Sequence, residues 1–208
     1  INKKQPGLLS NLQQIESLLL AGITVGSAKL KTPLLCSGGN LSYTKSLFNK
    51  LKPYEKNYNI LSGDDMFFLE KIIREDDCHI QINSKSIVET EGAKSFTEMV
   101  SRSVRWASKS SKLAMSLSTV FGAIVLIINC SILFMTVLVI LDIDSIVFFI
   151  KLCAVKTIVD VLFLVLLAKR YGRFQTIIYF PIMVVFYPFY LFIVSLATVF
   201  SSPSWKGR

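Results

Sequence analysis

Apolar residues divide the chain into a mixed first half and a second half that is almost continuously apolar. Three apolar stretches follow one another in the second half, at 113–141, 146–168 and 174–200. Each is long enough to cross a hydrocarbon core as a helix, which takes about 20 residues. We therefore predict a transmembrane region over 113–208 with about three hydrophobic helices. None of the stretches begins the chain, so none has the position of a signal peptide.

The first half mixes apolar and polar residues over shorter distances. Leucine and isoleucine recur at helical spacing after Asn11, and a further helical pattern begins at Asp64-Asp65 after the possible cap Ser62. Helices are expected at about 8–21, at 43–51 and from 64 onward. Short strands are expected at 33–36, 78–82 and 86–88. The sequence thus predicts a mixed α/β fold for residues 1–93.

Residues 94–112 predict an amphipathic helix at the membrane surface, with its apolar side toward lipid or toward the first half of the chain. Its basic side chains gather on the opposite side, and they are Arg102, Arg105, Lys109 and Lys112. This basic side binds either the anionic headgroups of lipids or a diphosphate, which a guanidinium suits. Trp106 is either an interface anchor or a flat surface for a sugar ring.

Charge gives the membrane region a direction. The chain has 23 Lys and Arg against 14 Asp and Glu, a formal net charge of +9. Basic residues precede the first apolar stretch and fill the turn at 169–173, whereas Asp142 and Asp144 lie in the turn between the first and second stretches. The positive-inside rule makes the basic turns cytoplasmic. We expect an integral membrane protein of a bacterial inner (plasma) membrane, with its soluble part in the cytoplasm.

The third apolar stretch leaves two alternatives open. Three full crossings would put the basic residues Lys206 and Arg208 outside, against the positive-inside rule. Pro181 and Pro188 would allow a re-entrant hairpin instead, which returns the end of the chain to the cytoplasm. The sequence does not decide between the crossing and the hairpin.

Two further groups of residues can carry chemistry. Asp64 and Asp65 either cap a helix, as acidic residues in a first turn commonly do, or supply a rigidly held general base that takes a proton from a hydroxyl. Gly38-Gly39-Asn40 follows a predicted strand and precedes a predicted helix. It is either a plain tight turn or a loop that presents backbone N–H groups to a ligand.

In their order along the chain, these motifs resemble the C-terminal part of a membrane-integrated family-2 glycosyltransferase, the group that includes cellulose and hyaluronan synthases and ceramide glucosyltransferases. The motifs are C-S-G-G-N-L-S-Y-T-K-S-L-F, S-G-D-D-M-F-F-L and R-S-V-R-W-A-S-K-S, followed by membrane spans. The resemblance implies transfer of a sugar from a nucleotide-sugar donor to a lipid or polysaccharide acceptor, with inversion. It also implies that 1–93 is the C-terminal half of a GT-A-like catalytic domain, before the interfacial helix at 94–112 and the transmembrane region at 113–208.

The resemblance assigns roles to residues at matching positions. Asp65 matches the catalytic base, and Asp64 matches the acidic position before it. The substrate-binding positions are Gly38, Gly39, Asn40, Arg102, Arg105 and Trp106. The last three match a Q-x-x-R-W motif in which Arg102 replaces the glutamine. The closing residues 205–208 resemble a tail seen in glucosyltransferases that act on lipids.

The resemblance places the metal site outside this chain. The family's nucleotide-binding half, with the D-x-D motif that holds Mg²⁺ or Mn²⁺ on the donor diphosphate, should precede Ile1. We therefore expect a fragment that is inactive alone. Asp142-Ile143-Asp144 is a literal D-x-D, but it lies in the predicted outer turn, so we assign no metal ligand in this chain. The four cysteines follow no disulfide or metal spacing and are interpreted as small buried residues.

Two other functions stay open. One is a non-catalytic membrane module or subunit. The other is an ion-coupled transporter that uses Lys156 and Asp160, which are four residues apart and can pair on one helix face. The transporter does not account for the motifs of the first half. The expected partners are a nucleotide-sugar donor, a lipid or polysaccharide acceptor and membrane lipids, and no pattern points to nucleic acid.

Overall fold

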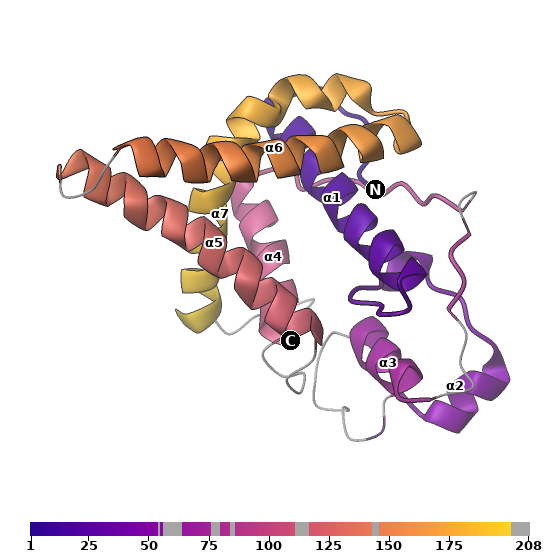
Figure 1. Ribbon diagram of the computed structural model, residues 1–208. Helices are drawn as coiled ribbons and strands as arrows, with labels where there is room; N and C mark the ends of the chain where they lie inside the picture. Colours follow the sequence, from indigo (N-terminus) through magenta and orange to yellow (C-terminus); the bar gives the residue numbers. More distant parts are fainter. Residues whose placement is uncertain are drawn as a thin grey trace.

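The computed structural model describes residues 1–53, 55, 64–75, 80–83, 86–110, 117–142 and 146–200. The helices in this part of the chain are α1 (Leu8–Lys29), η1 (Gly38–Asn40), α2 (Lys45–Leu51), α3 (Asp64–Ile73), α4 (Phe96–Ser110), α5 (Leu117–Ile140), α6 (Ile146–Tyr171), η2 (Phe174–Tyr179) and α7 (Phe180–Phe200). Figure 1 shows α1, α4, α6 and α7 packed together, with α5 running out beside α6 and with α2 and α3 at one corner.

The predicted α/β fold, with a GT-A-like domain, is wrong: over the described ranges every regular element is a helix, so the fold is all-α. The predicted strand at 33–36 is an irregular link, as are 80–82 and 86–88, while residues 78 and 79 lie outside the described residues. Asn2 and Thr90 form an isolated parallel bridge. A strand needs hydrogen-bond partners along its edge, and the pairing of these short runs stops at that bridge within the described part of the chain.

Helix α1 is the centre of the first apolar cluster. Its buried residues lie at helical spacing and pack on α6 and on the start of α7; the cluster contains Leu12, Ile15, Leu18, Leu164, Leu167, Phe180 and Met183. The helix continues past Gly22, where the sequence predicted its end. A Cβ at Gly22 would come within 2.5 Å of Leu167 Cδ1, so the missing side chain allows α6 to approach closely and compensates for the low helix propensity of glycine.

The second apolar cluster joins α4 to α7. Met99 and Val104 of α4 are buried against Tyr190 and Val194 of α7. At the same contact, Ser103 Oγ and Tyr190 Oη form a hydrogen bond of 2.5 Å. The amphipathic segment therefore packs its apolar side on a neighbouring hydrophobic helix of the same chain.

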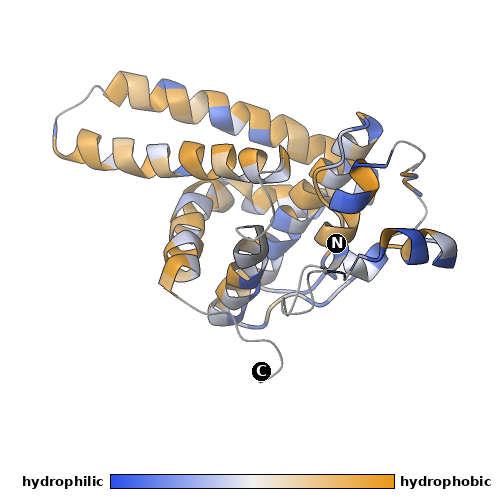
Figure 2. Ribbon diagram, turned by 90° about the horizontal axis from the view of Figure 1, so that it is seen from below, coloured by the Kyte–Doolittle hydropathy of each residue, from blue (hydrophilic) through white to orange (hydrophobic). Residues whose placement is uncertain are grey.

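The α5–α6 hairpin is apolar and exposed along much of its length. Figure 2 shows hydrophobic residues over most of α5, and over α6 with hydrophilic interruptions. Among the described residues, two helical segments are long and apolar enough to cross a membrane, Leu117–Ile140 and Phe174–Phe200. The helix between them, α6, is long enough but carries Lys151, Lys156 and Asp160.

The third apolar stretch forms one continuous helix, α7, after the short helix η2. Pro181 lies in the first turn of α7, where a missing N–H breaks no helical hydrogen bond. Pro188 is buried inside the same helix, which continues to Phe200. The chain does not reverse at either proline, so the re-entrant hairpin is wrong for the described residues.

Candidate active site around Asp65 and helix α4

Asp65 lies in the first turn of α3 and is held by the chain around the glycine turn. The N–H of Gly38 donates to Asp65 Oδ2 at 3.0 Å, and the thiol of Cys36 donates to the Asp65 carbonyl at 3.1 Å. The N–H of Met66 donates to Asp65 Oδ1 at 2.9 Å. A Cβ on Gly38 would lie 3.6 Å from the Asp65 side chain. Gly38 is therefore in direct hydrogen-bond contact with the predicted base.

The segment that leads into the glycine turn is fixed at Leu34. The N–H of Leu34 donates to Ser27 Oγ of α1 at 3.1 Å. The carbonyl of Leu34 accepts a hydrogen bond from Ser118 Oγ, in the first turn of α5, at 2.6 Å. Asp65 is thus connected through residues 34–38 to α1 and to the start of the first membrane-length helix.

Cys36 contributes a contact that the sequence analysis missed. Burial, followed by the negative charge of Asp65, raises the pKa of the Cys36 thiol from 9.0 to about 12. The thiol therefore stays protonated near neutral pH and remains a hydrogen-bond donor to the backbone of Asp65. Its position two residues before the glycine turn was a signal in the sequence, but nothing there indicated a partner on α3.

The other predicted residues near the turn have different partners. The backbone N–H of Asn40 closes the turn on the Ser37 carbonyl at 2.9 Å, and its side-chain amide donates to the Ser86 carbonyl at 2.9 Å. Gly39 lies close to Ser37 Oγ, which a Cβ would approach to 3.8 Å. Asp64 begins α3, but its side chain lies outside the described residues, as does Ser62. Gly38 is therefore the residue of this turn that binds α3.

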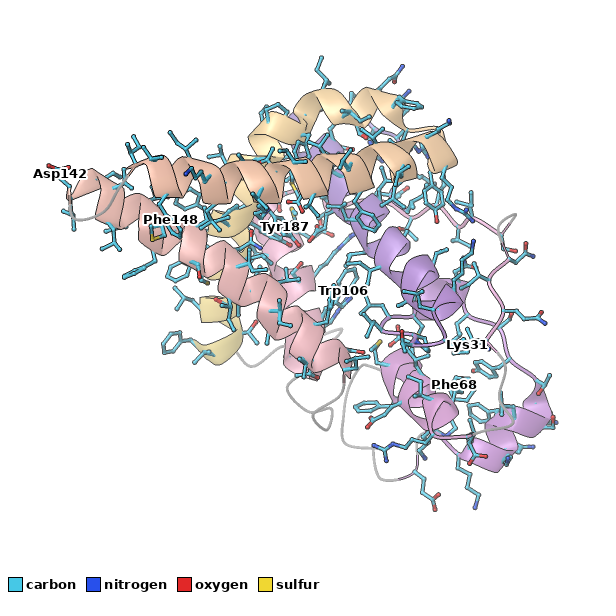
Figure 3. The ribbon with its side chains drawn as sticks, viewed as in Figure 1. Lys31, Phe68, Trp106, Asp142, Phe148 and Tyr187 are labelled. Atoms are coloured by element: carbon cyan, nitrogen blue, oxygen red, sulfur yellow. The ribbon has the colours of Figure 1, made fainter. Side chains whose placement is uncertain are left out.

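Arg102 of α4 binds one residue of its own helix and one residue just before that helix. It forms an ion pair with Glu98 at 2.6 Å and donates to the Glu91 carbonyl at 3.0 Å. Burial, followed by the positive charge of Arg102, lowers the pKa of Arg105. Trp106 keeps 52% of its surface exposed, and Figure 3 labels it between the ribbons of α4 and α1. Arg102 therefore shapes α4, and Trp106 offers an exposed ring.

The start of α5 contacts the segment that leads into the glycine turn, and α5 follows α4 in the sequence. Arg105 and Trp106 lie toward the end of α4, and this end is on the side of the bundle nearest α3 (Figure 1). Ser118 of α5 in turn contacts Leu34. The structure thus joins Gly38 to Asp65 directly and carries the Arg-Trp motif on a separate helix. Two other basic residues were predicted on the same face as Arg102 and Arg105. Of these, the Lys109 side chain and all of Lys112 lie outside the described residues.

The remaining predicted features lie elsewhere. Lys156 and Asp160 form the expected ion pair on one face of α6, at 2.5 Å. Asp142 is at the tip of the α5–α6 hairpin, at the opposite end from α3 (Figure 3). Over the described ranges, no three His, Cys, Asp or Glu side chains gather as a metal ion would require. Residues 205–208, with the predicted tail motif, lie outside the described residues.

Comparison with known proteins places most of the chain in a family. A family model described as glycosyl transferase family 21 matches residues 40–208. The comparisons with curated proteins and with solved structures found no match. The match supports a glycosyltransferase, as the resemblance implied, but it does not support the grouping with the cellulose and hyaluronan synthases of family 2. Helix α1 and residues 34–38 precede the matched region.

Proposed function

Because this chain belongs to glycosyl transferase family 21, we propose that it moves a sugar from a nucleotide-sugar donor to a hydroxyl of a lipid or polysaccharide acceptor at the cytoplasmic face of a membrane. The observation that carries this proposal is the contact between Gly38 and Asp65. It fixes a carboxylate at the start of a helix, next to a glycine turn and near the first membrane-length helix. A base for an acceptor that comes from the membrane needs such a position.

Asp65 is the general base in this mechanism. Its carboxylate takes the proton of the acceptor hydroxyl while the hydroxyl oxygen bonds to the anomeric carbon. The bond from that carbon to the diphosphate oxygen breaks and leaves its electron pair on the nucleoside diphosphate, so the anomeric centre is inverted. Each carboxylate oxygen has two lone-pair directions, and the N–H groups of Gly38 and Met66 occupy one on each oxygen. Asp65 therefore keeps acceptor capacity for the proton.

Arg105 binds the donor diphosphate, and Trp106 packs against a sugar ring. The guanidinium of Arg105 stays charged in proteins, and its partial desolvation strengthens its attraction for a phosphate. The exposed ring of Trp106 is one residue further along the same helix. The adjacent positions bring a cation and an aromatic surface to one end of α4.

The other predicted residues have supporting roles. Asp64 adds negative charge beside the base, and Gly38, Gly39 and Asn40 line the acceptor side of the site. Arg102 acts through its bonds to Glu98 and Glu91, which shape α4. Mg²⁺ or Mn²⁺ is expected with the donor from the resemblance, but the described residues do not gather into a fitting ligand set. No step of the mechanism is therefore assigned to a metal.

We further propose that α5 and α6 cross a bacterial inner (plasma) membrane as a hairpin, while the Phe174–Phe200 segment packs beside α4. The lysine and aspartate in α6 form an ion pair with each other, which reduces the cost of burying them in the bilayer. The basic residues of α4 and of the turn at 169–173 lie on the cytoplasmic side, as the positive-inside rule requires. The base and the Arg-Trp motif then share the cytoplasmic face.

The test is sugar transfer by membranes that contain the chain expressed from its natural open reading frame. Labelled sugar nucleotides are supplied with Mg²⁺ or Mn²⁺, and membrane lipid extract or oligosaccharides serve as acceptors. Asp65→Asn should lower the transfer rate by about 100- to 10,000-fold, because a general base contributes that much. Donor affinity should remain nearly unchanged. Glu70→Gln is the matched control, since Glu70 lies on the same helix and pairs with Arg74.

Arg105→Ala separates donor binding from proton transfer. It should weaken donor binding, whereas Asp65→Asn should not. Normal transfer by Asp65→Asn would remove the base assignment, and unchanged donor affinity in Arg105→Ala would remove the diphosphate role. If wild-type membranes transfer no sugar from any common donor, the non-catalytic membrane module becomes the better account.

A further inference from the structure

Gln13 of α1 is buried and binds the backbone N–H and carbonyl of a residue 80 positions away. Its Nε2 donates to the Ala93 carbonyl at 3.0 Å, and its Oε1 accepts from the Ala93 N–H at 2.6 Å. The side chain is 4% exposed. Both polar ends of one amide are therefore paired with both polar groups of one residue, and this pairing fixes direction as well as distance.

Ala93, the residue that Gln13 holds, lies just before α4. Ser95 caps this helix: its Oγ accepts from the Glu98 N–H at 3.2 Å, and Glu98 Oε2 accepts from the Lys94 N–H at 2.8 Å. This arrangement is a variant of the capping box in which Glu98 binds the N–H of the residue before the cap, and it fixes the direction in which the helix starts. The backbone from Ala93 to Glu98 is therefore rigidly defined, and Gln13 attaches it to α1.

Arg102 strengthens the same attachment from inside α4. Its guanidinium donates to the Glu91 carbonyl at 3.0 Å while it pairs with Glu98. Residues 91–93 are thus held on one side by α4 and on the other by α1. A displacement of Ala93 would move the start of α4 as a unit, and Arg105 and Trp106 lie on that unit.

We propose that Gln13 is a positioning residue for the donor site: it holds α4 so that Arg105 and Trp106 meet the diphosphate and the sugar. This inference rests on the proposed function of α4. It assigns a role in sugar transfer to α1, which lies outside the matched region 40–208. Gln13 itself touches neither donor nor acceptor.

The neighbouring glutamine provides a matched control. Gln14 is on the same helix and is 2% exposed, but no described residue forms a hydrogen bond with its side-chain amide. Gln14→Ala and Gln13→Ala therefore remove the same atoms from equally buried positions. Only Gln13→Ala removes the attachment of α4. A purely structural role for glutamine volume in α1 would affect both variants alike.

The first readout is kinetic. In the full protein, Gln13→Ala should raise the KM for the sugar nucleotide about tenfold, which corresponds to the loss of two ordinary hydrogen bonds. Its kcat should change less. Gln14→Ala should keep a KM within about twofold of the wild-type value. Equal KM values in the two variants would overturn the proposal.

The second readout does not need activity. With Trp205 and any tryptophan outside these 208 residues replaced by Phe, acrylamide quenching reports on Trp106 of α4. The quenching constant should rise in Gln13→Ala and stay at the wild-type value in Gln14→Ala. If the wild-type chain transfers no sugar, the proposed function fails while quenching still decides whether Gln13 positions α4. Quenching that is the same in both variants would overturn the proposal.

Gly92→Ala tests the contact from the other side if Gln13→Ala does not fold. A Cβ on Gly92 would lie 3.1 Å from Gln13 Oε1, which is tighter than an ordinary contact. The added methyl should push the same amide without changing α1. A smaller rise in KM and in quenching, in the same direction as for Gln13→Ala, is expected. Wild-type values of both would count against the positioning role.

Discussion

Asp65 and the Arg-Trp motif are held in place by different forces. Around Asp65 the contacts are hydrogen bonds from Gly38, Cys36 and Met66. The helices α1, α4, α6 and α7 instead hold together through two buried apolar clusters, with a few polar attachments between them. Apolar burial is large and without direction, whereas a hydrogen bond adds little net stability but fixes orientation.

This difference separates stability from geometry. The apolar bundle should set whether the chain folds, and the loop at 34–38 should set how the carboxylate of Asp65 is aimed. Substitutions in the two regions should therefore give different phenotypes: loss of folded protein in the first and loss of turnover in folded protein in the second. The following changes test that separation, beginning with the largest expected effect.

Ile15→Ala should give the largest loss of stability. Ile15 has no exposed surface and lies in the cluster between α1 and α6. Removing a buried aliphatic side chain costs about 2–5 kcal/mol of unfolding free energy. Denaturant unfolding in detergent micelles measures it, with Leu30→Ala as the control because Leu30 is 77% exposed. Equal stability of the two variants would mean that the bundle does not hold the fold.

The unfolding free energy should fall with rising pH because of one buried carboxylate inside the bundle. Burial raises the pKa of Glu16 from 4.5 to about 7, and Tyr187 and Tyr190 of α7 lie within electrostatic range of this carboxylate. Between these two pH values the unfolded chain is ionised at Glu16 while the folded chain is still protonated. Stability from this group is therefore present below pH 4.5 and is lost as pH rises through about 7.

The expected loss is about 3.5 kcal/mol, because the pKa of Glu16 differs by about 2.5 between the folded and unfolded chain and each pKa unit corresponds to about 1.4 kcal/mol. Unfolding free energy measured from pH 4 to pH 8 should fall over this window in the wild type. Glu16→Gln should remove most of the slope, since an amide does not titrate. A wild-type slope that persists unchanged in Glu16→Gln would assign the pH dependence to other groups.

Gly38→Pro should affect turnover with little effect on stability. Ser37 has φ −131° and ψ 121°, an extended conformation that a following proline favours, and Gly38 opens the short helix η1. Proline therefore suits the backbone of this turn, but its Cδ takes the place of the N–H that binds Asp65 Oδ2, so the bond is lost and the carboxylate has to move aside. Turnover should fall about 10- to 100-fold, as expected for a hydrogen bond to a charged group.

Gly38→Ala is the control for that substitution. It keeps the N–H, and its Cβ would lie 3.6 Å from the Asp65 side chain, an ordinary van der Waals distance. Near wild-type turnover is therefore expected in the transfer assay. If Gly38→Pro unfolds as readily as Ile15→Ala, the loop contributes to folding and the two regions are not separate.

Long periodic patterns predicted structure better than short ones did. The stretches at 94–112, 113–141, 146–168 and 174–200 each contain a long helix in the structure, because many residues repeat the same signal. The short apolar runs at 33–36 and 86–88 resemble strands locally, but a strand also needs a partner, which local sequence does not specify. The extension of α1 beyond Gly22 depends on Leu167, 145 residues later in the sequence.

The candidate site shows the same limit. The motif spacing was enough to select Gly38 and Asp65, and the structure brings these two residues together. It was not enough to find Cys36 as a partner of Asp65, or Gln13 as a partner of Ala93. Those contacts join residues 29 and 80 positions apart, and each involves a backbone group that every residue carries. Such contacts leave no residue-type signal in the sequence.

The attachments of residues 34–38 bear on how this family member can change during evolution. Leu34 is bound to α1 and α5 through its own N–H and carbonyl, and Gly38 is bound to α3 through its N–H. These contacts use backbone atoms, so they tolerate many side chains. They do not tolerate an added or deleted residue, because five residues reach only a limited distance. Across related chains, the length of this segment should be preserved more strictly than its composition.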